Sequence, residues 1–368
     1  VTEAITGLDL VEWQLRVASG EPLPLKQEQL VLTGHAIEAR ICAENPDNNF
    51  LPATGTLQVY RKPACTSFER STTRVDDGVR EGDAISPFYD SMVAKLIVHG
   101  DTREQALARL DAALAQTHIV GLATNVQFLR RVARSDAFAQ ARLDTALIPR
   151  ESAVLFQQEP VGLALAAAAD VAQTLTDERA GEGSDPFSKT DGWRSHGVFA
   201  RRFAFEFGGQ TVQASLRYLH DGVLHLTVGE GELAVAGLLS FQKAATGDGL
   251  VVSYAGQRAK VQVYRRGEVA HVFTEAGATQ ITSVDLLAHA GDGQSEGGRL
   301  TAPMPGKVVS FAVKAGDVVK KGQPLAVMEA MKMEHTIAAP ADGTVAELMF
   351  APGDQVTEGS ELLRLARA

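Results

Sequence analysis

The sequence predicts a multidomain chain of the α+β class, in which a mixed first region is followed by a β-barrel around a helix and by a small all-β domain. Three observations predict this division. Helix and strand patterns alternate over residues 1–150, evenly spaced turn signals occupy residues 208–277, and an internal repeat fills the C-terminal end. A chain of 368 residues is also too long for one ordinary core.

The composition excludes several classes of function. A net charge of −10 argues against a nucleic-acid binder, because Lys and Arg are not concentrated for binding phosphates. No apolar run is long enough to span a bilayer, so we expect no membrane partner. Two cysteines, Cys42 and Cys65, indicate a reducing compartment, and the histidines show no ligand spacing with them, so no metal site is predicted.

The chain begins at Val1, in what reads as a helix, without an initiating methionine or a signal peptide. We therefore expect it to be the tail of a longer polypeptide. The Ala- and Arg-rich composition suggests a bacterial cytoplasm, and the corresponding expectation for a eukaryotic source is the mitochondrial matrix.

In the first region, helical spacing predicts an opening helix that ends near Gly20. Its apolar positions are Leu8, Val11, Leu15 and Ala18. Alternation predicts a strand over residues 35–41, with Ile37, Ala39 and Ile41 on one face. Thr102 is the expected N-cap of a further helix. The apolar stripe of that helix consists of Ala106, Leu107, Leu110 and Leu114.

The middle region predicts one long helix from Ser152 to about Thr176, followed by strands. Seven turn signals imply eight strands, and their spacing of about ten residues is typical of a barrel or sandwich. The signals are Gly208-Gly209, Asp221-Gly222, Gly229-Glu230-Gly231, Gly247-Asp248-Gly249, Gly256, Gly267 and Gly277. Because a long Ala-rich helix needs an enclosing surface, we expect the barrel to surround it.

Two polar, glycine-rich stretches are predicted to be linkers because they pack poorly and are costly to order. They are residues 180–186 and 290–298. The predicted domains are residues 1–150, 151–289 and 299–368, with 290–298 as a flexible connection.

The C-terminal region contains an internal repeat. Shifting residues 302–325 by 37 positions gives nine identities over 24 positions, three of them glycines. Two equivalent β units that cover each other around a pseudo-two-fold axis are the physical interpretation.

Lys332 lies at the junction of the two repeats, in Glu329-Ala330-Met331-Lys332-Met333. A tight turn at this junction would project the lysine from a rigid scaffold, and the flexible thioethers of Met331 and Met333 suit adaptable contacts with a partner. The alternative is an ordinary exposed lysine beside minor core methionines. The repeat, its junction and the paired methionines favour a carrier lysine.

These residues resemble the biotinyl domain of biotin carboxylases over residues 300–366, on Pro303-Met304-Pro305-Gly306 and the Lys332 motif. The resemblance implies covalent biotin on Lys332, attached by a biotin protein ligase. The related lipoyl domain usually has Asp and Ala around its lysine, so Met331 and Met333 favour biotin. A lipoate-carrying transacylase also ends in a large acyltransferase domain that this sequence lacks.

The first region resembles the C-terminal part of a biotin carboxylase domain of the ATP-grasp fold. The matching segments are residues 1–7, 34–40 and 89–92. The resemblance implies that Arg40 stabilises the enolate-like biotin ureido oxygen, and a planar, permanently charged guanidinium suits that task. The alternative for Arg40 is a surface ion pair with Glu38. The glycine-rich loop, lysines and carboxylates that bind MgATP in this family are not in the sequence, so MgATP is expected only in the complete subunit.

The middle region resembles the domain that docks alpha subunits of acyl-CoA carboxylases on a carboxyltransferase beta subunit. Asp185-Pro186-Phe187-Ser188 and Asp191-Gly192-Trp193-Arg194 are most similar to methylcrotonyl-CoA carboxylase alpha subunits, although Trp193 could equally be a core or barrel-rim aromatic. The implied enzyme is a ligase of leucine catabolism. It uses MgATP and bicarbonate to carboxylate biotin, which delivers the carboxyl group to an acyl-CoA, 3-methylcrotonyl-CoA, on the beta subunit. Alternatives are a propionyl-CoA or acetyl-CoA carboxylase alpha subunit, or a non-catalytic carrier and scaffold.

Overall fold

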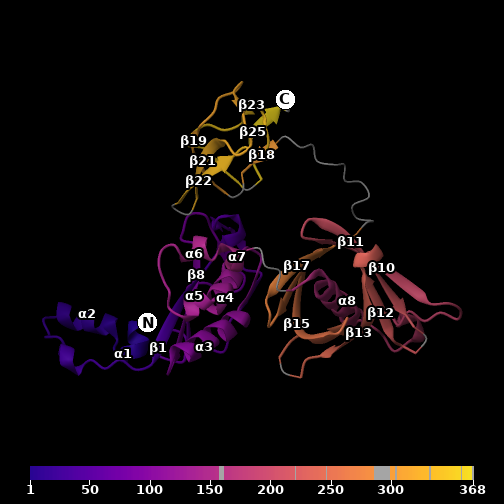
Figure 1. Cartoon of the computed structure of the whole chain (residues 1–368), viewed down its shortest axis with the longest axis horizontal. Helices are drawn as coiled ribbons and strands as arrows, with labels where there is room; N and C mark the ends of the chain where they lie inside the picture. Colours follow the sequence, from indigo (N-terminus) through magenta and orange to yellow (C-terminus); the bar gives the residue numbers. More distant parts are fainter. Residues whose placement is uncertain are drawn as a thin grey trace. The chain divides into compact units, whose positions relative to one another are not determined.

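The computed structural model describes residues 1–156, 161–219, 221–245, 247–285, 299–302, 305–330, 333–357 and 359–366. The chain forms two compact units (Figure 1). One comprises Val1–Gln157 and Gln294–Ala368, and the other comprises Gln158–Gly293. Among the described helices, none is both long and apolar enough to cross a membrane.

The chain opens with two short helices, α1 (Thr2–Thr6) and α2 (Leu10–Ala18), where one opening helix ending near Gly20 was expected. Gly7 ends α1 in the left-handed conformation, which only glycine adopts without strain. The Asp9 side chain then caps α2 by accepting from the backbone N–H groups of Val11 and Glu12.

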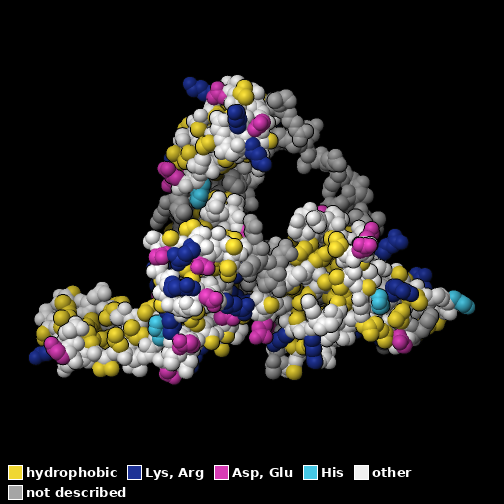
Figure 2. Space-filling model, viewed as in Figure 1, with side chains coloured by type: hydrophobic (Ala, Val, Ile, Leu, Met, Phe, Trp, Pro, Cys, Tyr) yellow, Lys and Arg dark blue, Asp and Glu magenta, His cyan; other side chains and the backbone are white. Residues whose placement is uncertain are grey.

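The apolar face of α2 is exposed. The helix buries none of its residues, and Val11 and Leu15 are both more than half exposed. Figure 2 shows hydrophobic side chains gathered on the surface over α1 and α2. An amphipathic helix normally buries such a face against another element.

A three-stranded antiparallel sheet forms the core of the first region, in the order β1 (His35–Cys42), β8 (Met92–Gly100), β6 (Thr73–Asp77). The predicted alternation is confirmed, because Ile37, Ala39 and Ile41 are buried. Helix α3 (Arg103–Ala115) packs against β8 and β1. Its predicted cap and stripe are confirmed: Thr102 Oγ1 accepts from Gln105 N at 3.3 Å, and all four stripe residues are buried.

Short elements complete this region. The strands are β2 (Glu44–Asn45), β3 (Leu51–Pro52), β4 (Gly55–Thr56), β5 (Val59–Arg61), β7 (Ala84–Ile85) and β9 (His118–Val120). The helices are α4 (Val126–Arg134), α5 (Asp136–Ala139), α6 (Leu147–Arg150) and α7 (Ser152–Leu155).

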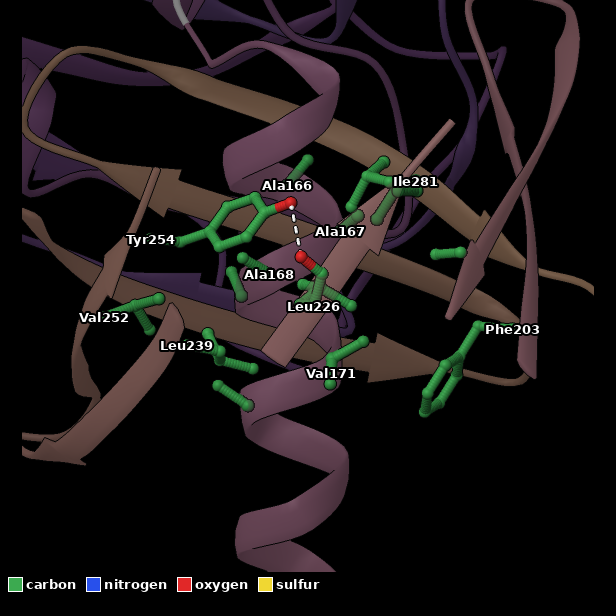
Figure 3. Close-up of a cluster of buried hydrophobic side chains, with 14 of the residues drawn as sticks. Ala166, Ala167, Ala168, Val171, Phe203, Leu226, Leu239, Val252, Tyr254 and Ile281 are labelled. Atoms are coloured by element: carbon green, nitrogen blue, oxygen red, sulfur yellow. Dashed lines mark hydrogen bonds between the residues drawn. The ribbon is translucent and has the colours of Figure 1, made fainter. Parts of the chain in front are cut away.

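The predicted barrel around a helix is confirmed. Eight consecutive antiparallel strands close into a barrel, and every predicted turn signal falls between two of them. The strands are β10 (Phe199–Phe207), β11 (Gln210–Tyr218), β12 (Leu224–Val228), β13 (Val235–Lys243), β14 (Leu250–Tyr254), β15 (Gln257–Arg266), β16 (Val269–Thr274) and β17 (Ala278–Ser283). Helix α8 (Leu163–Ala180) lies inside (Figures 1 and 3).

The helix predicted from Ser152 to Thr176 is wrong at both ends. Phe156 has extended backbone angles and ends α7, and Gly162 is the N-cap of a separate helix that continues to Ala180. Alanines at 166–169 are fully buried, because small side chains let large ones from the strands approach the helix axis. Figure 3 shows Leu226, Leu239, Val252 and Ile281 around these alanines, with the Tyr254 hydroxyl donating to the Leu226 carbonyl at 3.3 Å.

The stretch 180–186 was predicted to be a linker inside the domain 151–289. It connects α8 to the barrel within one unit, and local hydrogen bonds order it. The second predicted linker, 290–298, lies outside the described residues.

The C-terminal repeat forms two four-stranded sheets, β18-β25-β23-β20 and β22-β21-β19-β24. The first-repeat strands are β18 (Arg299–Thr301), β19 (Gly306–Phe311), β20 (Val318–Val319) and β21 (Pro324–Ala330). Their counterparts are β22 (Met333–Ala338), β23 (Gly343–Leu348), β24 (Gln355–Val356) and β25 (Glu361–Ala366). Because the 37-residue shift converts one sheet order into the other, the predicted two-fold relation of the repeats is confirmed.

Candidate functional site

The chain turns between β21 and β22 within two residues. Ala330 pairs with Met333, and Met331 and Lys332 are the residues between them. Both lie outside the described residues, as does the side chain of Met333, whose backbone begins β22. The predicted location of Lys332 at a tight turn between the repeats therefore agrees with the register of the two strands.

Close packing holds the base of this hairpin. Gly306 lies so near β21 that a Cβ atom at this position would be 2.6 Å from the Glu329 carbonyl oxygen and 3.3 Å from Ala330 Cβ. Only glycine allows this approach of two backbones. Met328 and Ala330 are buried beneath the hairpin, so the scaffold up to the turn is rigid.

Two carboxylates and one histidine lie next to the turn. Glu329 and Glu334 face each other across the strands, and both are exposed. Like charges directly opposite are unfavourable in a strand pair, so these glutamates are not explained by the stability of the hairpin. His335 pairs with Met328 on the inner face, where burial lowers its pKa and keeps the imidazole neutral.

Arg40 extends from β1 into solvent, with 72% of its side chain exposed. Its Nε lies 3.7 Å from Glu38 Oε1, so the ion pair considered as the alternative role is present. The contact is long and open to water, and such pairs contribute little to stability. An exposed guanidinium with one loose partner is accessible to a negatively charged group.

The motif at residues 89–92 and the end of β1 lie together, although 47 residues separate Ser91 from Glu44. Ser91 Oγ donates to the Glu44 carboxylate at 2.7 Å, and the Ala43 N–H donates to the Ser91 carbonyl at 2.8 Å. Two of the segments that carry the family resemblance therefore form one structure.

Burial, helped by the Glu44 charge, raises the pKa of the nearby Cys42 thiol to about 11, so the thiol stays protonated near neutral pH.

Asn125 is a residue that the sequence patterns missed. Its side chain binds the backbone of β1 at Arg40 and Cys42. A helix N-cap position was the only signal available, and it indicates a local role. The contact with β1 spans more than 80 residues and is visible only in the fold.

An ordered loop between α8 and β10 presents two exposed aromatics. Phe187 is 98% exposed and Trp193 is 78% exposed, so the alternative of Trp193 in the core is wrong. Asp185 accepts from the backbone N–H of Phe187 at 2.9 Å, and Asp191 accepts from that of Trp193 at 2.9 Å. The loop therefore holds both aromatics outward on fixed turns.

Glu182 orders the same loop. Its carboxylate accepts from the Thr190 hydroxyl at 2.6 Å and from the Thr190 N–H at 2.9 Å, and Lys189 Nζ is 3.2 Å away. These hydrogen bonds, those of Thr190 first, lower the pKa of Glu182 to about 2. Large aromatics that a monomer leaves exposed are typical of protein interfaces.

No cluster of three or more His, Cys, Asp or Glu side chains arranged to hold a metal occurs in the part of the chain that the structure describes. The biotin attachment site implied by the Lys332 motif is consistent with the residues present. The described residues beside the motif are the closely packed Gly306 and the strand pair β21–β22, whose register leaves Met331 and Lys332 between Ala330 and Met333.

Comparison with protein families assigns the three regions. Residues 38–150 match the biotin carboxylase C-terminal domain, residues 160–286 match the BT domain of the methylcrotonyl-CoA carboxylase alpha-subunit, and residues 298–365 match the family of biotin-requiring enzymes. The chain thus belongs to the biotin-dependent carboxylases, in the domain order of their alpha subunits.

The relatives define the match further. The chain is 37% identical to the mitochondrial methylcrotonoyl-CoA carboxylase subunit alpha of Dictyostelium discoideum, over 98% of this chain and 53% of the relative. The Mus musculus protein of that name is 36% identical, over 99% and 51%. The propionyl-CoA carboxylase alpha chain of Mus musculus is 32% identical, over 99% and 51%. The chain therefore spans about half the length of the curated relatives it matches.

Among solved structures, the biotin carboxylase domain of the Hydrogenobacter thermophilus 2-oxoglutarate carboxylase is 36% identical. It matches over 43% of this chain and 34% of that chain with a TM-score of 0.40, which is too low to support a conclusion about the fold.

Proposed function

We propose that this chain is the biotin-carrying part of a methylcrotonoyl-CoA carboxylase alpha subunit, with biotin in amide linkage to Lys332. The observation that carries the proposal is the two-residue turn containing Lys332 between β21 and β22, within the region that matches biotin-requiring enzymes. Biotin supplies a ureido nitrogen that can accept a carboxyl group and give it up again. A biotin protein ligase is the partner that would attach it.

The residues of the first region would act in the carboxylation step. Under this proposal MgATP and bicarbonate bind in the complete biotin carboxylase domain, and Arg40 faces the ureido oxygen of biotin. Its exposed guanidinium would donate hydrogen bonds to that oxygen as negative charge develops there. The exposed apolar face of α2 supports a larger domain, because the rest of that domain would cover it.

The transfer step would take place on a carboxyltransferase beta subunit, which binds the acyl-CoA. We propose that the loop carrying Phe187 and Trp193 docks there, since it presents two fixed aromatics to solvent. The match of residues 160–286 to the BT domain supports 3-methylcrotonyl-CoA as the acceptor, as does the higher identity to the mouse methylcrotonoyl enzyme than to the mouse propionyl enzyme. A panel of the two acyl-CoA substrates on the assembled enzyme decides between them.

The named eukaryotic relatives are mitochondrial. We propose the mitochondrial matrix for a eukaryotic form of this chain and the cytoplasm for a bacterial one. Fractionation followed by a streptavidin blot tests this.

The first experiment is the intact mass of the chain after co-expression with a biotin protein ligase. We expect a gain of one biotinyl group that is absent in Lys332→Ala. Lys321→Ala, which removes an exposed lysine of the same domain, is the matched control and retains the modification. An unmodified wild-type chain beside an active ligase would refute the carrier role.

A further inference from the structure

The side chain of Asn125 makes different hydrogen bonds from those expected at its position in the chain. Asn125 is the N-cap residue of α4, where an asparagine normally accepts a hydrogen bond from the first turn of its helix. Here it makes no such bond. The amide is directed instead to β1, where Nδ2 donates to the Arg40 carbonyl at 3.0 Å and Oδ1 accepts from the Cys42 N–H at 2.9 Å.

These bonds imitate a neighbouring strand. The C=O of one residue and the N–H of the second residue along point to the same edge of a strand. The Asn125 amide satisfies both, and its own backbone N–H adds a third bond to the Cys42 carbonyl at 3.1 Å. Since β8 occupies the other edge of β1, Asn125 closes the edge that has no strand at Arg40 and Cys42.

The hydrogen bonds between Asn125 and β1 lie beside an irregularity in the sheet. Ile41 pairs with Ala94 but Cys42 pairs with Met92, so Val93 is an extra residue on β8. A bulge of this kind weakens the ladder locally and changes the direction of nearby side chains. Beside the bulge, Asn125 supplies the regular hydrogen bonds that hold the backbone of β1. It is 7% exposed, so water cannot readily replace it.

We infer that Asn125 is a positioning residue for Arg40, an inference that rests on the proposed role of Arg40 in carboxylation. The Arg40 side chain is exposed and its ion pair with Glu38 is long, so little besides the backbone of β1 determines the position of its guanidinium. A displacement of about 1 Å in a catalytic group can reduce a rate by about 100-fold. Asn125 prevents such a displacement without contacting the substrate.

The experiment uses the complete subunit and compares Asn125→Ala with Thr102→Ala. Thr102 caps α3 in the same region, and its side chain accepts a hydrogen bond from within its own helix, so it is a matched loss of a helix N-cap residue. Two rates are measured: carboxylation of free biotin, and ATP cleavage that requires bicarbonate but no biotin. We expect Asn125→Ala to lower kcat for biotin carboxylation by about 10- to 100-fold while ATP cleavage stays within about twofold.

Asn125→Asp separates positioning from folding. The carboxylate keeps an acceptor for the Cys42 N–H but places a second oxygen against the Arg40 carbonyl, whereas the neutral acid can donate to it. The ratio of its biotin carboxylation rate to that of wild type should therefore rise as the pH falls. If both rates of Asn125→Ala fall together in proportion to its thermal stability, as expected for Thr102→Ala, or if neither changes, the inference is wrong.

Arg40→Ala in the same assay keeps the two claims distinct. If Arg40→Ala carboxylates biotin normally, the proposed role of Arg40 is wrong. If Arg40→Ala is inactive toward biotin and Asn125→Ala is fully active, the inference about Asn125 alone is overturned.

Discussion

The barrel that encloses α8 contains a buried charge, and its removal gives a quantitative test of the packing. Asp170 on α8 is fully buried, and burial raises its pKa although Arg265 lies beside it. Arg265 Nη2 donates to the Asp170 carboxylate, to the Asp170 carbonyl at 3.1 Å and to Thr174 Oγ1 at 2.7 Å. Arg265→Met would leave the carboxylate without its charge partner.

The expected cost is about 3 kcal/mol of unfolding free energy at neutral pH, the lower end for breaking a buried ion pair, because Arg265 retains some exposure. Hydrogen exchange of the barrel strands under urea measures it for that unit separately. Replacing both partners, in Asp170→Leu with Arg265→Met, should recover most of the loss, since a well-packed apolar pair removes the unpaired charge. If the unfolding free energy of Arg265→Met alone lies within about 0.5 kcal/mol of wild type, this account of the barrel interior is wrong.

The sign of the pH effect follows from the raised pKa. The unfolded chain loses the Asp170 proton more readily than the folded barrel, so this group lowers stability as pH rises through its unfolded pKa, and the decline stops above its folded pKa. Removing Arg265 moves the folded pKa further up. The deficit of Arg265→Met should therefore grow with pH, and Asp170→Asn in that background should abolish the dependence. A deficit that shrinks with rising pH would contradict the assignment.

Two further predictions concern the candidate site. Gly306→Ala forces β19 away from β21, because its Cβ would meet the Glu329 carbonyl at 2.6 Å, and should destabilise the biotinyl domain by about 1–3 kcal/mol and slow ligase modification of Lys332. Gly353→Ala separates crowding from backbone strain in the same mass assay, because its Cβ meets nothing within 4 Å whereas its backbone φ, unlike that of Gly306, is positive. Phe187→Ala with Trp193→Ala should weaken beta-subunit binding at least about tenfold in a pull-down while biotinylation is unchanged, and undiminished binding would exclude this loop as the docking surface.

How much of this structure the sequence predicts depends on whether the information is local. The barrel was predictable because glycines lie at every reversal, and most of them, such as Gly256 and Gly267, have a positive φ. The start of α8 was missed although Pro160 and Gly162 are local helix-breaking signals, whereas the extended backbone at Phe156 that ends α7 depends on tertiary packing. There Phe156 packs against Phe50 and Phe128.

The functional residues divide in the same way. Lys332 was predicted as a carrier lysine from a motif of five residues and a repeat, both of which are local patterns. The hydrogen bonds of Asn125 with β1 could not be predicted, because Asn125 lies 85 residues beyond Arg40 and its position predicts an ordinary helix N-cap. The outward position of Trp193 was also undetermined, since aromatic residues occur both in barrel cores and at interfaces.

The two-fold relation of the repeats bears on the proposed carrier role of Lys332. Under the 37-residue shift, the pair β21–β22 corresponds to the pair β25–β18 of the other sheet. The first pair is joined directly by Met331-Lys332, whereas the second is the place where the chain enters at β18 and finishes at β25. The proposed carrier lysine and the entry of the chain into the domain therefore lie at equivalent but separate strand pairs. We therefore expect changes in the length or composition of the predicted linker 290–298, which precedes β18, to leave the strands β21 and β22 beside Lys332 unaltered.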